Sequence, residues 1–497
     1  MPATRESSLA DATFPNIDGG TFDHPASLIV ALLTVAGAGL RLSHLGAKSL
    51  WLDEGATVAL ARTSWTHFAW VWWHGEASLQ TIYFLLMRGW VHAGLGEAWL
   101  RLPSALFGIT SIPLLYIVAR KLIPAASALA ATALLAFSPA AVYYSQEARS
   151  YAFAILLILL STYFFVLAVQ ADRRRDWALW TLFGIASFYT HDFAALVLVA
   201  QTASLFFKRP PVPWRRAFVY GSLILLAAVP GLTYVVRASP ENLHFVWMPR
   251  ANPKEIWHLA KFFGGSGVKV AVSLALWIAG VVTIFRHRRV AENDSFWSGV
   301  LILLWATLPA IVLGLISIRE PLFLQRYMVF SLPATVLLAA LGMEALRKWR
   351  IGLVLVIALC AMSLPTIVRQ YHKPREDWRA ASDIVLASAT QGDAVVFFPF
   401  YTRIVFDYYR DRFDVVAPPL QVFAPGFYAG GQNDGDLVAA LTRDPHQFRH
   451  VWVLVADHGT SLQNFATVEQ QLHATFGPPT VRKFAAIDVL QYGDRPR

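Results

Sequence analysis

Residues 151–170 read YAFAILLILLSTYFFVLAVQ and contain no charged side chain. A helix needs about 20 residues to cross about 30 Å of hydrocarbon, so this stretch predicts a membrane-spanning helix. Similar apolar runs begin near residues 26, 102, 123, 177, 193, 217, 268, 296, 327 and 351. The sequence therefore predicts an all-α polytopic membrane protein with about 11 transmembrane helices.

The composition of the 497-residue chain agrees with this interpretation. Hydrophobic residues make up 56% of the chain, charged residues only 15%, and the mean hydropathy is +0.47. Soluble proteins carry about 25% charged residues, which cover their surfaces. The single cysteine, Cys360, excludes a disulfide framework within one chain. These values exclude a cytosolic enzyme, a disulfide-rich secreted module and a disordered scaffold.

The basic residues predict the orientation of the spans. Five short clusters follow every second predicted span, provided that residues 78–95, with Arg88 and His92, do not cross. Under the positive-inside rule the N-terminus lies inside, the C-terminus lies outside, and the net charge of +10 is a topology signal rather than a sign of nucleic-acid binding. The clusters are Arg120/Lys121, Arg173–Arg175, Lys208/Arg209/Arg215/Arg216, Arg286/Arg288/Arg289 and Arg347/Lys348/Arg350.

This orientation divides the chain into three parts. We expect a cytoplasmic tail over 1–25, a transmembrane domain over 26–368 with an outer loop at 45–101, and a small extracytoplasmic α/β domain over 369–497. The last part has normal charge, two strand-like runs (DAVVFFPF and HVWVLVAD) and an amphipathic run near 464–476. The tryptophans of the outer loop, at 65, 70, 72 and 73, predict a helix lying in the membrane interface.

The first outer loop offers two candidate catalytic carboxylates, Asp53 and Glu54, in SLWLDEGATVALA. Adjacent helical residues point about 100° apart, so we expect only one of them to face a shared site. Such a carboxylate can deprotonate a hydroxyl acceptor, and it can equally cap a helix or bind a metal.

Charged residues also gather in the other outer loops. YYSQEARSY (143–151) places Glu147 and Arg149 in a tight turn, where they either bind a ligand or pair with each other. YTHDF contributes His191, for which an ordinary hydrogen-bonded interfacial histidine is the simpler interpretation. IREPLFLQRYMVF contributes Arg319 and Arg326. Several arginines at this depth predict a pocket for an anionic lipid phosphate.

The sequence has no P-loop, GxGxxG, HExxH or GxSxG motif, so nucleotide hydrolysis is not predicted. No cofactor is assigned. A divalent metal is possible, with His74 and Glu76 near Asp53, but no metal ligand is predicted with a spacing motif.

Several segments together resemble bacterial members of glycosyltransferase family 39, relatives of the protein O-mannosyltransferases with the GT-C membrane fold. The resemblance covers most of residues 26–400, and its specificity lies in the order and spacing of its pieces. These are RLSHLGAKSLWLDEGATVALA, EASLQTIYFLLMRGW, LRLPSALFGITSIPLLYIVARKL, FSPAAVYYSQEARSYAF, YTHDFAAL, LQRYMVFSLPATVLLAA and KPREDWRAA.

The resemblance implies an inverting hexosyl- or pentosyltransferase of the plasma (inner) membrane that uses a polyprenyl-phosphate sugar donor. It implies that Asp53 is the catalytic base or a carboxylate that orients the acceptor, and that the Gln146–Arg149 segment lies near the donor phosphate. We therefore expect the donor phosphate to be bound by Arg149, Arg326, His191 and Arg319, with Gln146 and Glu147 in support. His191 and Arg326 match further positions of the family. The stretch Leu79-Gln80-Thr81-Ile82-Tyr83 departs from the pattern of many relatives, so the acceptor, a glycan, lipid or protein, is left open.

Two other classes compete with the glycosyltransferase. A transporter or flippase of lipid-linked sugars places its charges near the bilayer midplane, whereas the notable charges here gather at the outer ends of the spans. A non-catalytic scaffold leaves the Asp53–Glu54 and Gln146–Arg149 segments without a purpose.

Overall fold

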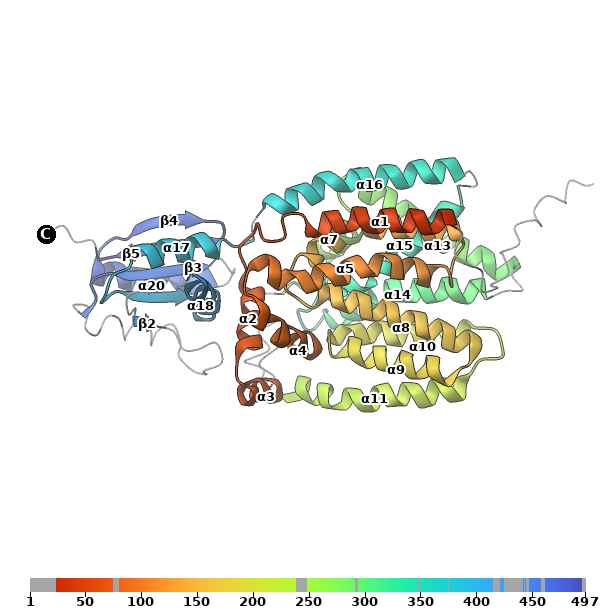
Figure 1. Ribbon diagram of the computed structural model, residues 1–497, viewed down its shortest axis with the longest axis horizontal. Helices are drawn as coiled ribbons and strands as arrows, with labels where there is room; N and C mark the ends of the chain where they lie inside the picture. The colour runs from red at the N-terminus through yellow and green to blue at the C-terminus, as the bar shows by residue number, and fades with distance from the viewer. Residues whose placement is uncertain are drawn as a thin grey trace, which may run out of the picture.

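A bundle of long helices forms most of the molecule, and a small sheet domain caps one end (Figure 1). The computed structural model describes residues 24–74, 80–237, 248–290, 294–346, 349–373, 375–413, 421–423, 441, 443, 447–456 and 461–493. The predicted tail over residues 1–25 lies outside the described residues except for His24 and Pro25, which begin the first helix.

Eight helices in the described part of the chain are long and apolar enough to cross a membrane, or nine if one bent pair counts as a span. The bent pair is α6 (Ala125–Ala136) with α7 (Pro139–Ser145). The eight are α1 (His24–Leu42), α5 (Glu97–Ala119), α8 (Tyr151–Ala171), α11 (Trp214–Arg237), α13 (Val268–Val290), α14 (Ser295–Ile316), η5 (Gln325–Ser331) continuing into α15 (Leu332–Glu344), and α16 (Trp349–His372).

Each of the 11 predicted apolar runs is helical, but two of them give shorter helices. α9 (Arg174–Phe188) begins at a charged turn, and α10 (Ala195–Ser204) is flanked by the 3-10 turns η2 (Asp192–Ala194) and η3 (Leu205–Phe207). Polar residues at the ends shorten both helices, so length and composition support eight or nine spans rather than eleven. Both helices still run alongside α8 within the bundle (Figure 1).

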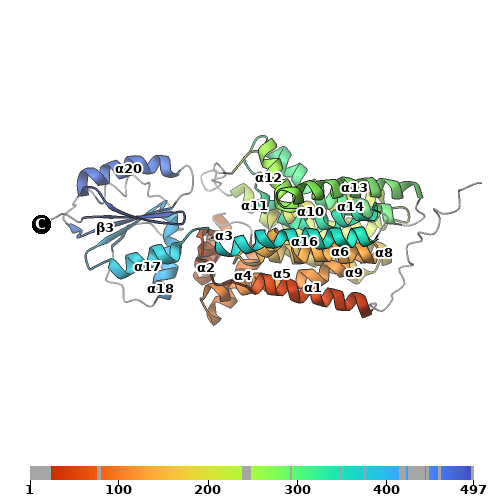
Figure 2. The same ribbon diagram turned by 90° about the horizontal axis from the view of Figure 1, so that it is seen from above.

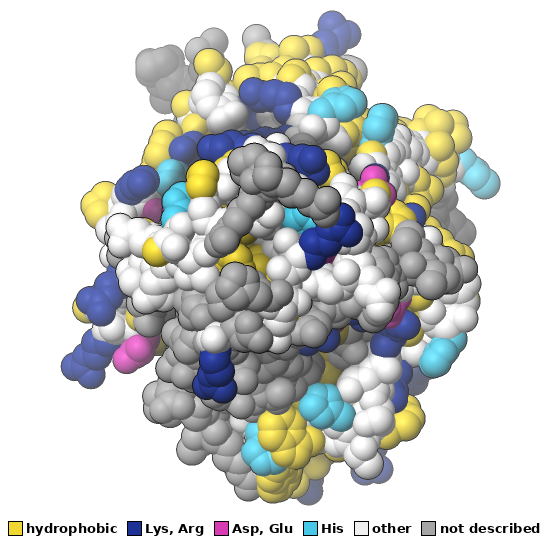
Figure 3. All heavy atoms as spheres, turned by 90° about the vertical axis from the view of Figure 1, so that its left-hand side faces the viewer, with side chains coloured by type: hydrophobic (Ala, Val, Ile, Leu, Met, Phe, Trp, Pro, Cys, Tyr) yellow, Lys and Arg dark blue, Asp and Glu magenta, His cyan; other side chains and the backbone are white. Residues whose placement is uncertain are grey.

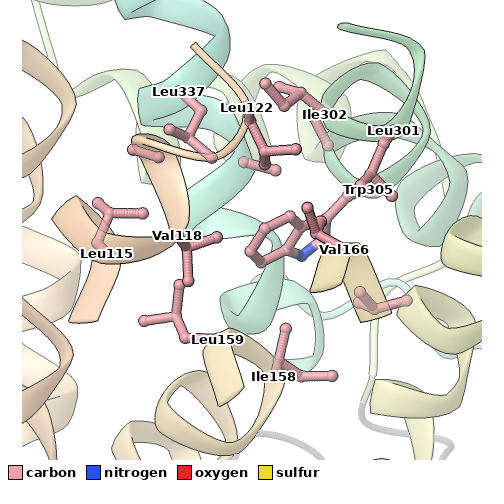
Figure 4. Close-up of a cluster of buried hydrophobic side chains, with 14 of the residues drawn as sticks. Leu115, Val118, Leu122, Ile158, Leu159, Val166, Leu301, Ile302, Trp305 and Leu337 are labelled. Atoms are coloured by element: carbon pink, nitrogen blue, oxygen red, sulfur yellow. The ribbon is translucent and has the colours of Figure 1, made fainter. Parts of the chain in front are cut away.

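The bundle is held by a dry core between α5, α8, α14 and α15. Figure 4 shows Leu115 and Val118 of α5 facing Ile158 and Val166 of α8, with Trp305 of α14 close by. The Trp305 ring is fully buried, and its indole N–H donates to the carbonyl of Phe330 at 2.9 Å. The outward faces of α1, α11 and α16 instead expose leucine, isoleucine, valine and phenylalanine side chains, as lipid-facing helices do.

The two ends of the bundle differ. α16 runs from the far end to the sheet domain, and α1 likewise begins at the far end (Figures 1 and 2). The described residues of the five basic clusters lie in the helix ends and connections at that far end. The end-on view from the sheet domain shows basic side chains and histidines scattered among apolar ones (Figure 3).

The outer loop forms three short helices beneath the sheet domain: α2 (Leu52–Arg62), α3 (Trp65–His74) and α4 (Thr81–Trp90). The segment 78–95 does not cross the bundle, as expected, because α4 is only 10 residues long and ends in the 3-10 turn η1 (Val91–Ala93). α3 exposes Trp65, Trp70 and Trp73. One further amphipathic helix, α12 (Pro253–Gly264), lies between α11 and α13 in sequence.

The C-terminal domain is a mixed five-stranded sheet in the order β2-β1-β3-β5-β4. β1 pairs with β2 and β3 in parallel, and β5 pairs with β3 and β4 antiparallel. Figure 2 shows α17 and α18 on one face and α20 on the other. The elements are α17 (Trp378–Ser388), β1 (Ala394–Phe398), α18 (Arg403–Arg412), β2 (Gln421–Phe423), β3 (Val451–Ala456), α20 (Ser461–Phe476), β4 (Thr480–Phe484) and β5 (Ile487–Tyr492).

One hydrophobic core joins this domain to the outer loop. Alternate residues of β1 and β3 face α20, and the intervening ones pack with α17, α18 and the helices of the outer loop. The approach is close at Gly55 of α2, where an added Cβ atom would lie 2.8 Å from Cγ2 of Val405. Glu97 reinforces the contact through ion pairs with Arg379, at 2.7 Å, and Arg412.

Candidate active site

The break between α6 and α7 positions the first wall of the site. Pro139 begins α7, and the Ser138 hydroxyl caps it by accepting from the backbone N–H of Ala141. The axes of the two helices differ by 53°. The buried guanidinium of Arg41 donates to the carbonyls of Leu135 and Ala136, at 3.3 and 3.0 Å, and so satisfies the end of α6. As a result α7 turns toward the sheet-domain end and carries Tyr143 and Tyr144 there.

Gln146 fixes the loop after α7 by hydrogen bonds to the backbone at the end of α1. Its side-chain amide donates to the carbonyls of Arg41 and Ser43, at 3.0 and 2.7 Å. Gln146 therefore ties this loop to the end of α1, which agrees with the supporting role expected from the sequence. The loop then presents Glu147 and Arg149 to the first residues of α2.

Trp51 is the N-cap residue of α2, so Asp53 lies in the first turn, where the helix dipole favours a negative charge. Glu376, from the linker between α16 and α17, accepts from the backbone N–H of Leu52 at 3.1 Å. The same carboxylate accepts from the indole N–H of Trp378 at 2.6 Å. The start of the sheet domain thus holds the start of α2.

The structure brings Asp53, Arg149 and Arg326 together. Oδ2 of Asp53 lies 3.4 Å from Nη1 of Arg326 and 3.8 Å from Nη2 of Arg149. Arg149 also donates to the backbone carbonyl of Asp53 at 3.3 Å. Both arginine side chains are nearly buried, whereas the Asp53 side chain keeps 23% of its surface exposed. One carboxylate oxygen can therefore meet a ligand while two arginines hold its position.

Glu54 points the other way and is fully buried. Its carboxylate accepts from Nε and Nη2 of Arg101, at 2.8 and 2.7 Å, and from the backbone N–H of Ala148 at 2.8 Å. This paired geometry is the strong form of a buried ion pair. With no exposed oxygen, Glu54 is poorly placed for proton transfer, and the geometry favours Asp53 as the catalytic member of the predicted pair.

A cavity of about 420 Å³ adjoins this group. Lys261 of α12, Arg326 of η5 and Arg375 of the linker line it together with Tyr143, Tyr144 and Phe262, and no aspartate or glutamate is among its described lining residues. A cavity with three cations, aromatic walls and no lining carboxylate is suited to an anionic head group on an apolar tail. The cavity meets Asp53 through the Arg326 guanidinium.

Glu147 lies behind the wall of this cavity. Its carboxylate is buried, and the nearest cation is Nη1 of Arg375 at 3.5 Å. Burial raises the pKa of Glu147 to about 7, although Arg375 and Arg326 oppose the shift. Burial also lowers the pKa of the neighbouring Lys48, and Arg101 adds to that effect.

The two remaining predicted phosphate ligands lie elsewhere. The His191 ring packs among Tyr151, Tyr327 and Phe330, with its Nδ1 3.3 Å from Oδ1 of Asp192. It does not line the cavity, and its position next to η5 suits a support for Arg326. Arg319 is exposed in the turn after α14 and does not line the cavity either. The described geometry therefore favours neither residue as a direct phosphate ligand.

Within the described ranges, no three histidine, cysteine, aspartate or glutamate side chains are arranged to hold a metal ion. Glu76, which the sequence paired with His74, lies outside the described residues. The residues around Asp53 offer arginines rather than metal ligands, so no step of the chemistry below is routed through a metal.

Sequence reasoning missed Arg375 and Lys261. Both belong to segments that lie far from Asp53 in the chain, and only the tertiary fold brings them to one cavity. A signal existed for Arg375, since KPREDW places an arginine three residues before a tryptophan, just beyond the end of the last predicted span. The positive-inside rule explains basic residues on the cytoplasmic side only, so it does not account for an arginine on the predicted outer side.

Comparison with known proteins supports the same class. The sequence model of a family described as dolichyl-phosphate-mannose-protein mannosyltransferase matches residues 82–234. No curated protein matches the chain in sequence. The family match agrees with the resemblance predicted from the motifs.

Solved structures extend the match to nearly the whole chain. ArnT from Cupriavidus metallidurans is similar in the apo state, with a TM-score of 0.59, 16% identity and coverage of 94% of this chain and 98% of that one. For ArnT bound to undecaprenyl phosphate the TM-score is 0.58 and the identity 15%, with coverage of 94% of this chain and 97% of that one. A third similar structure is the oligosaccharyltransferase AglB from Archaeoglobus fulgidus, in complex with an inhibitory peptide and a dolichol-phosphate. Its TM-score is 0.52 and its identity 13%, with coverage of 95% of this chain and 75% of that one.

These matches confirm the predicted fold. The chain is a multi-pass membrane protein with the GT-C fold of membrane glycosyltransferases, and it carries a small C-terminal sheet domain. The family match and the structural matches agree with the predicted enzyme class, and none of them supports a flippase.

Proposed function

We propose that the protein transfers a sugar from a polyprenyl-phosphate donor to an acceptor hydroxyl, with inversion, at the end of the bundle that faces the sheet domain. The observation that carries the proposal is the position of Asp53. Its carboxylate lies 3.4 Å from Arg326, which also lines a cavity whose described lining residues include three cations and no carboxylate. A base and a phosphate site are therefore neighbours.

The donor is inferred from the chemistry of the cavity. A polyprenyl-phosphate sugar has a long apolar tail and a single phosphodiester charge, which suit the aromatic and cationic walls. The similar ArnT and AglB structures contain undecaprenyl phosphate and a dolichol-phosphate, which belong to this lipid class. The family model's description names a dolichyl-phosphate mannose donor, so mannose is the first sugar to test.

The proposed reaction has one displacement step. The Asp53 carboxylate takes the proton of the acceptor hydroxyl as that oxygen attacks C1 of the sugar from the face opposite the phosphate. The bond from C1 to the phosphate oxygen breaks, and the lipid phosphate leaves with the electron pair. Arg326 and Arg149 stabilise the charge that grows on the leaving phosphate. A phosphate needs no general acid to leave, which explains why one carboxylate suffices where glycosidases use two.

We place this reaction on the extracytoplasmic side of the plasma (inner) membrane. The described residues of the five basic clusters lie at the end of the bundle opposite the sheet domain, and such clusters favour the cytoplasmic side. Residues 369–497 then form an outer domain, whose first described helix begins at Trp378. That domain covers α2 and is the natural wall for a glycan, lipid or protein acceptor.

The transporter alternative fits the site less well. Transporters bind substrate near the bilayer midplane, at breaks in the helices. Asp53, Arg149 and Arg326 instead lie at the end of the bundle beside the sheet domain, where α2, the loop before α8 and η5 begin.

The direct test is to incubate purified protein with a panel of polyprenyl-phosphate sugars, beginning with the mannose donor, and to measure release of the lipid phosphate. Acceptors are supplied as membrane extract and as purified glycan, lipid and peptide fractions. Phosphate release that depends on an acceptor and is lost in Asp53→Asn supports the proposal. Movement of intact donor across a vesicle membrane, without release, overturns it in favour of transport.

A further inference from the structure

Arg375 occupies an unusual position for a residue of a domain linker. It lies between α16 and α17, and its guanidinium stacks 3.4 Å from the centroid of the Trp51 ring. Trp51 is the N-cap of α2, two positions before Asp53, and the Arg326 guanidinium lies 5.6 Å from the same ring. Arg375 is therefore held beside the catalytic group while 43% of its side chain stays exposed.

The anion that faces Arg375 is held loosely. Oε1 of Glu147 lies 3.5 Å from Nη1 of Arg375, and Oε2 of Glu147 has no hydrogen-bond partner among the described residues. The Tyr143 hydroxyl is the other side chain that bonds to this carboxylate. The buried pair of Glu54 and Arg101 differs, with contacts of 2.7 and 2.8 Å and a backbone donor as well. The first pair has fewer and longer contacts than the second, so less interaction is lost when the Arg375 guanidinium turns to another anion.

The surroundings favour an incoming anion. Arg375 opens on the same cavity as Arg326 and Lys261, and that cavity has no described lining carboxylate. Arg326 already balances its charge against Asp53, so Lys261 and Arg375 supply the remaining positive charge. A planar guanidinium held flat against an aromatic ring keeps its N–H edge free for two oxygens of one phosphate.

We propose that Arg375 is a ligand of the donor phosphodiester and exchanges Glu147 for a phosphate oxygen when the donor binds. This proposal rests on the proposed function and adds a residue to its donor site. Glu147 then acts as a resident anion that keeps Arg375 in place while the cavity is empty. Because Arg375 and Glu376 are adjacent, the residue that binds the phosphate is continuous with the one that caps α2.

The test compares three variants with the parent in nanodiscs of phosphatidylcholine, with undecaprenyl phosphate as the probe at pH 8. Arg375→Ala removes the contact with the phosphate, and Arg375→Lys keeps the positive charge but lacks the paired N–H groups of a planar guanidinium. Arg369→Ala is the matched control, since Arg369 lies in the last turn of α16, just before the linker, and its side chain bonds only to Pro365 and Thr366 among the described residues. A tryptophan fluorescence spectrum and a melting curve report folding.

We expect Arg375→Ala to weaken probe binding about ten- to hundredfold, with Arg375→Lys between it and the parent and Arg369→Ala equal to the parent. Parental binding by a folded Arg375→Ala overturns the proposal. A second arm adds phosphatidylglycerol, a bulk phosphodiester lipid. If phosphatidylglycerol displaces the probe from the parent at equal concentration, the site takes membrane head groups and the donor assignment is overturned.

This experiment is separate from the test of the proposed function, because binding of the probe needs neither a sugar nor an acceptor. Loss of binding in Arg375→Ala together with a parent that transfers no sugar overturns the transferase and leaves Arg375 as a lipid-phosphate ligand. Transfer by the parent together with unchanged binding in Arg375→Ala overturns only the role of Arg375.

Discussion

Oδ2 of Asp53 lies 3.4 Å from Nη1 of Arg326, so the proposed base and the proposed phosphate ligand form an ion pair with each other. Arg149 approaches the same oxygen at 3.8 Å. A donor phosphate that binds these arginines competes with Asp53 for them and leaves the carboxylate freer to accept a proton. Donor binding and activation of the base are coupled in this arrangement.

Replacing Asp53 by asparagine tests the base. The amide keeps the shape of the side chain but cannot accept the proton, so we expect turnover to fall about a hundred- to ten-thousandfold. Donor binding should survive, since both arginines remain. The measurement is transfer rate and donor affinity on the same preparation, and near-parental turnover would remove Asp53 from the role.

Replacing Glu54 by glutamine should damage the fold rather than the chemical step. It leaves the buried Arg101 guanidinium without a counter-charge, which costs about 3–5 kcal/mol of stability. Thermal unfolding of Glu54→Gln, with Asp53→Asn as the control that keeps this pair intact, measures the effect. A parental melting temperature combined with lost turnover would make Glu54 the catalytic carboxylate.

Arg326→Ala should weaken donor binding by about tenfold or more, because it removes a charge-assisted contact from the cavity lining. Arg149→Ala should also weaken donor binding, because Arg149, although not among the described lining residues, places its charge beside Asp53. Lysine at either position should rescue binding only in part, since it lacks the planar fork. Arg319→Ala is the control, because Arg319 lies outside the cavity lining. The measurement is donor affinity, by titration of folded protein. If Arg319→Ala loses more affinity than Arg149→Ala or Arg326→Ala, Arg319 is a phosphate ligand after all.

Donor affinity should fall as the pH rises through about 7. Burial raises the pKa of the Glu147 carboxyl to about 7, so it is neutral below this pH and an anion above it. The anion holds Arg375 and repels the phosphodiester, whose own charge is constant over this range. Other charged groups near Glu147 are Arg326, Lys48 and Glu54, while Tyr143 and Tyr144 stay neutral neighbours.

The measurement is binding of a polyprenyl-phosphate mannose between pH 6 and pH 8. Glu147→Gln, which cannot ionise, should bind with one affinity across that range. A parent that shows no dependence on pH, or a Glu147→Gln variant that keeps the parental dependence, contradicts the assignment.

Single cysteines should report the two ends of the bundle. In a Cys360→Ser background, exposed positions His473 and Lys483 of the sheet domain should react with a membrane-impermeant maleimide in intact cells. Arg174 and Arg286, at the opposite end, should react only after the cells are opened. Labelling of position 174 from outside would invert the proposed orientation.

Much of the fold follows from the sequence because membrane spans are a matter of local length and polarity. The run 151–170 predicts α8 almost to the residue, and Asp172, its C-cap residue in the left-handed conformation, ends it. Span counting is less secure where a helix is short, as with α9 and α10, since neighbouring helices rather than lipid bury much of their surface.

The site divides in the same way. Asp53 and Arg149 can be predicted because both are charged residues close in sequence to the end of a predicted span, Asp53 in the first turn of α2 and Arg149 in the loop before α8. The pairing of Glu54 with Arg101 cannot, because it joins α2 to the start of α5 through tertiary packing alone. The same holds for Arg375, whose role depends on the angle at which the linker meets Trp51.

The cap that Glu376 places on α2 has a consequence for biogenesis. The backbone N–H of Leu52, one residue before Asp53, finds this partner only after the chain has been synthesised past all of its spans. The apolar face of α2 likewise waits for α18 and the sheet. A nascent chain in the translocon therefore carries Asp53 on an unfinished helix, and sugar transfer begins only when the C-terminal segment has emerged and docked.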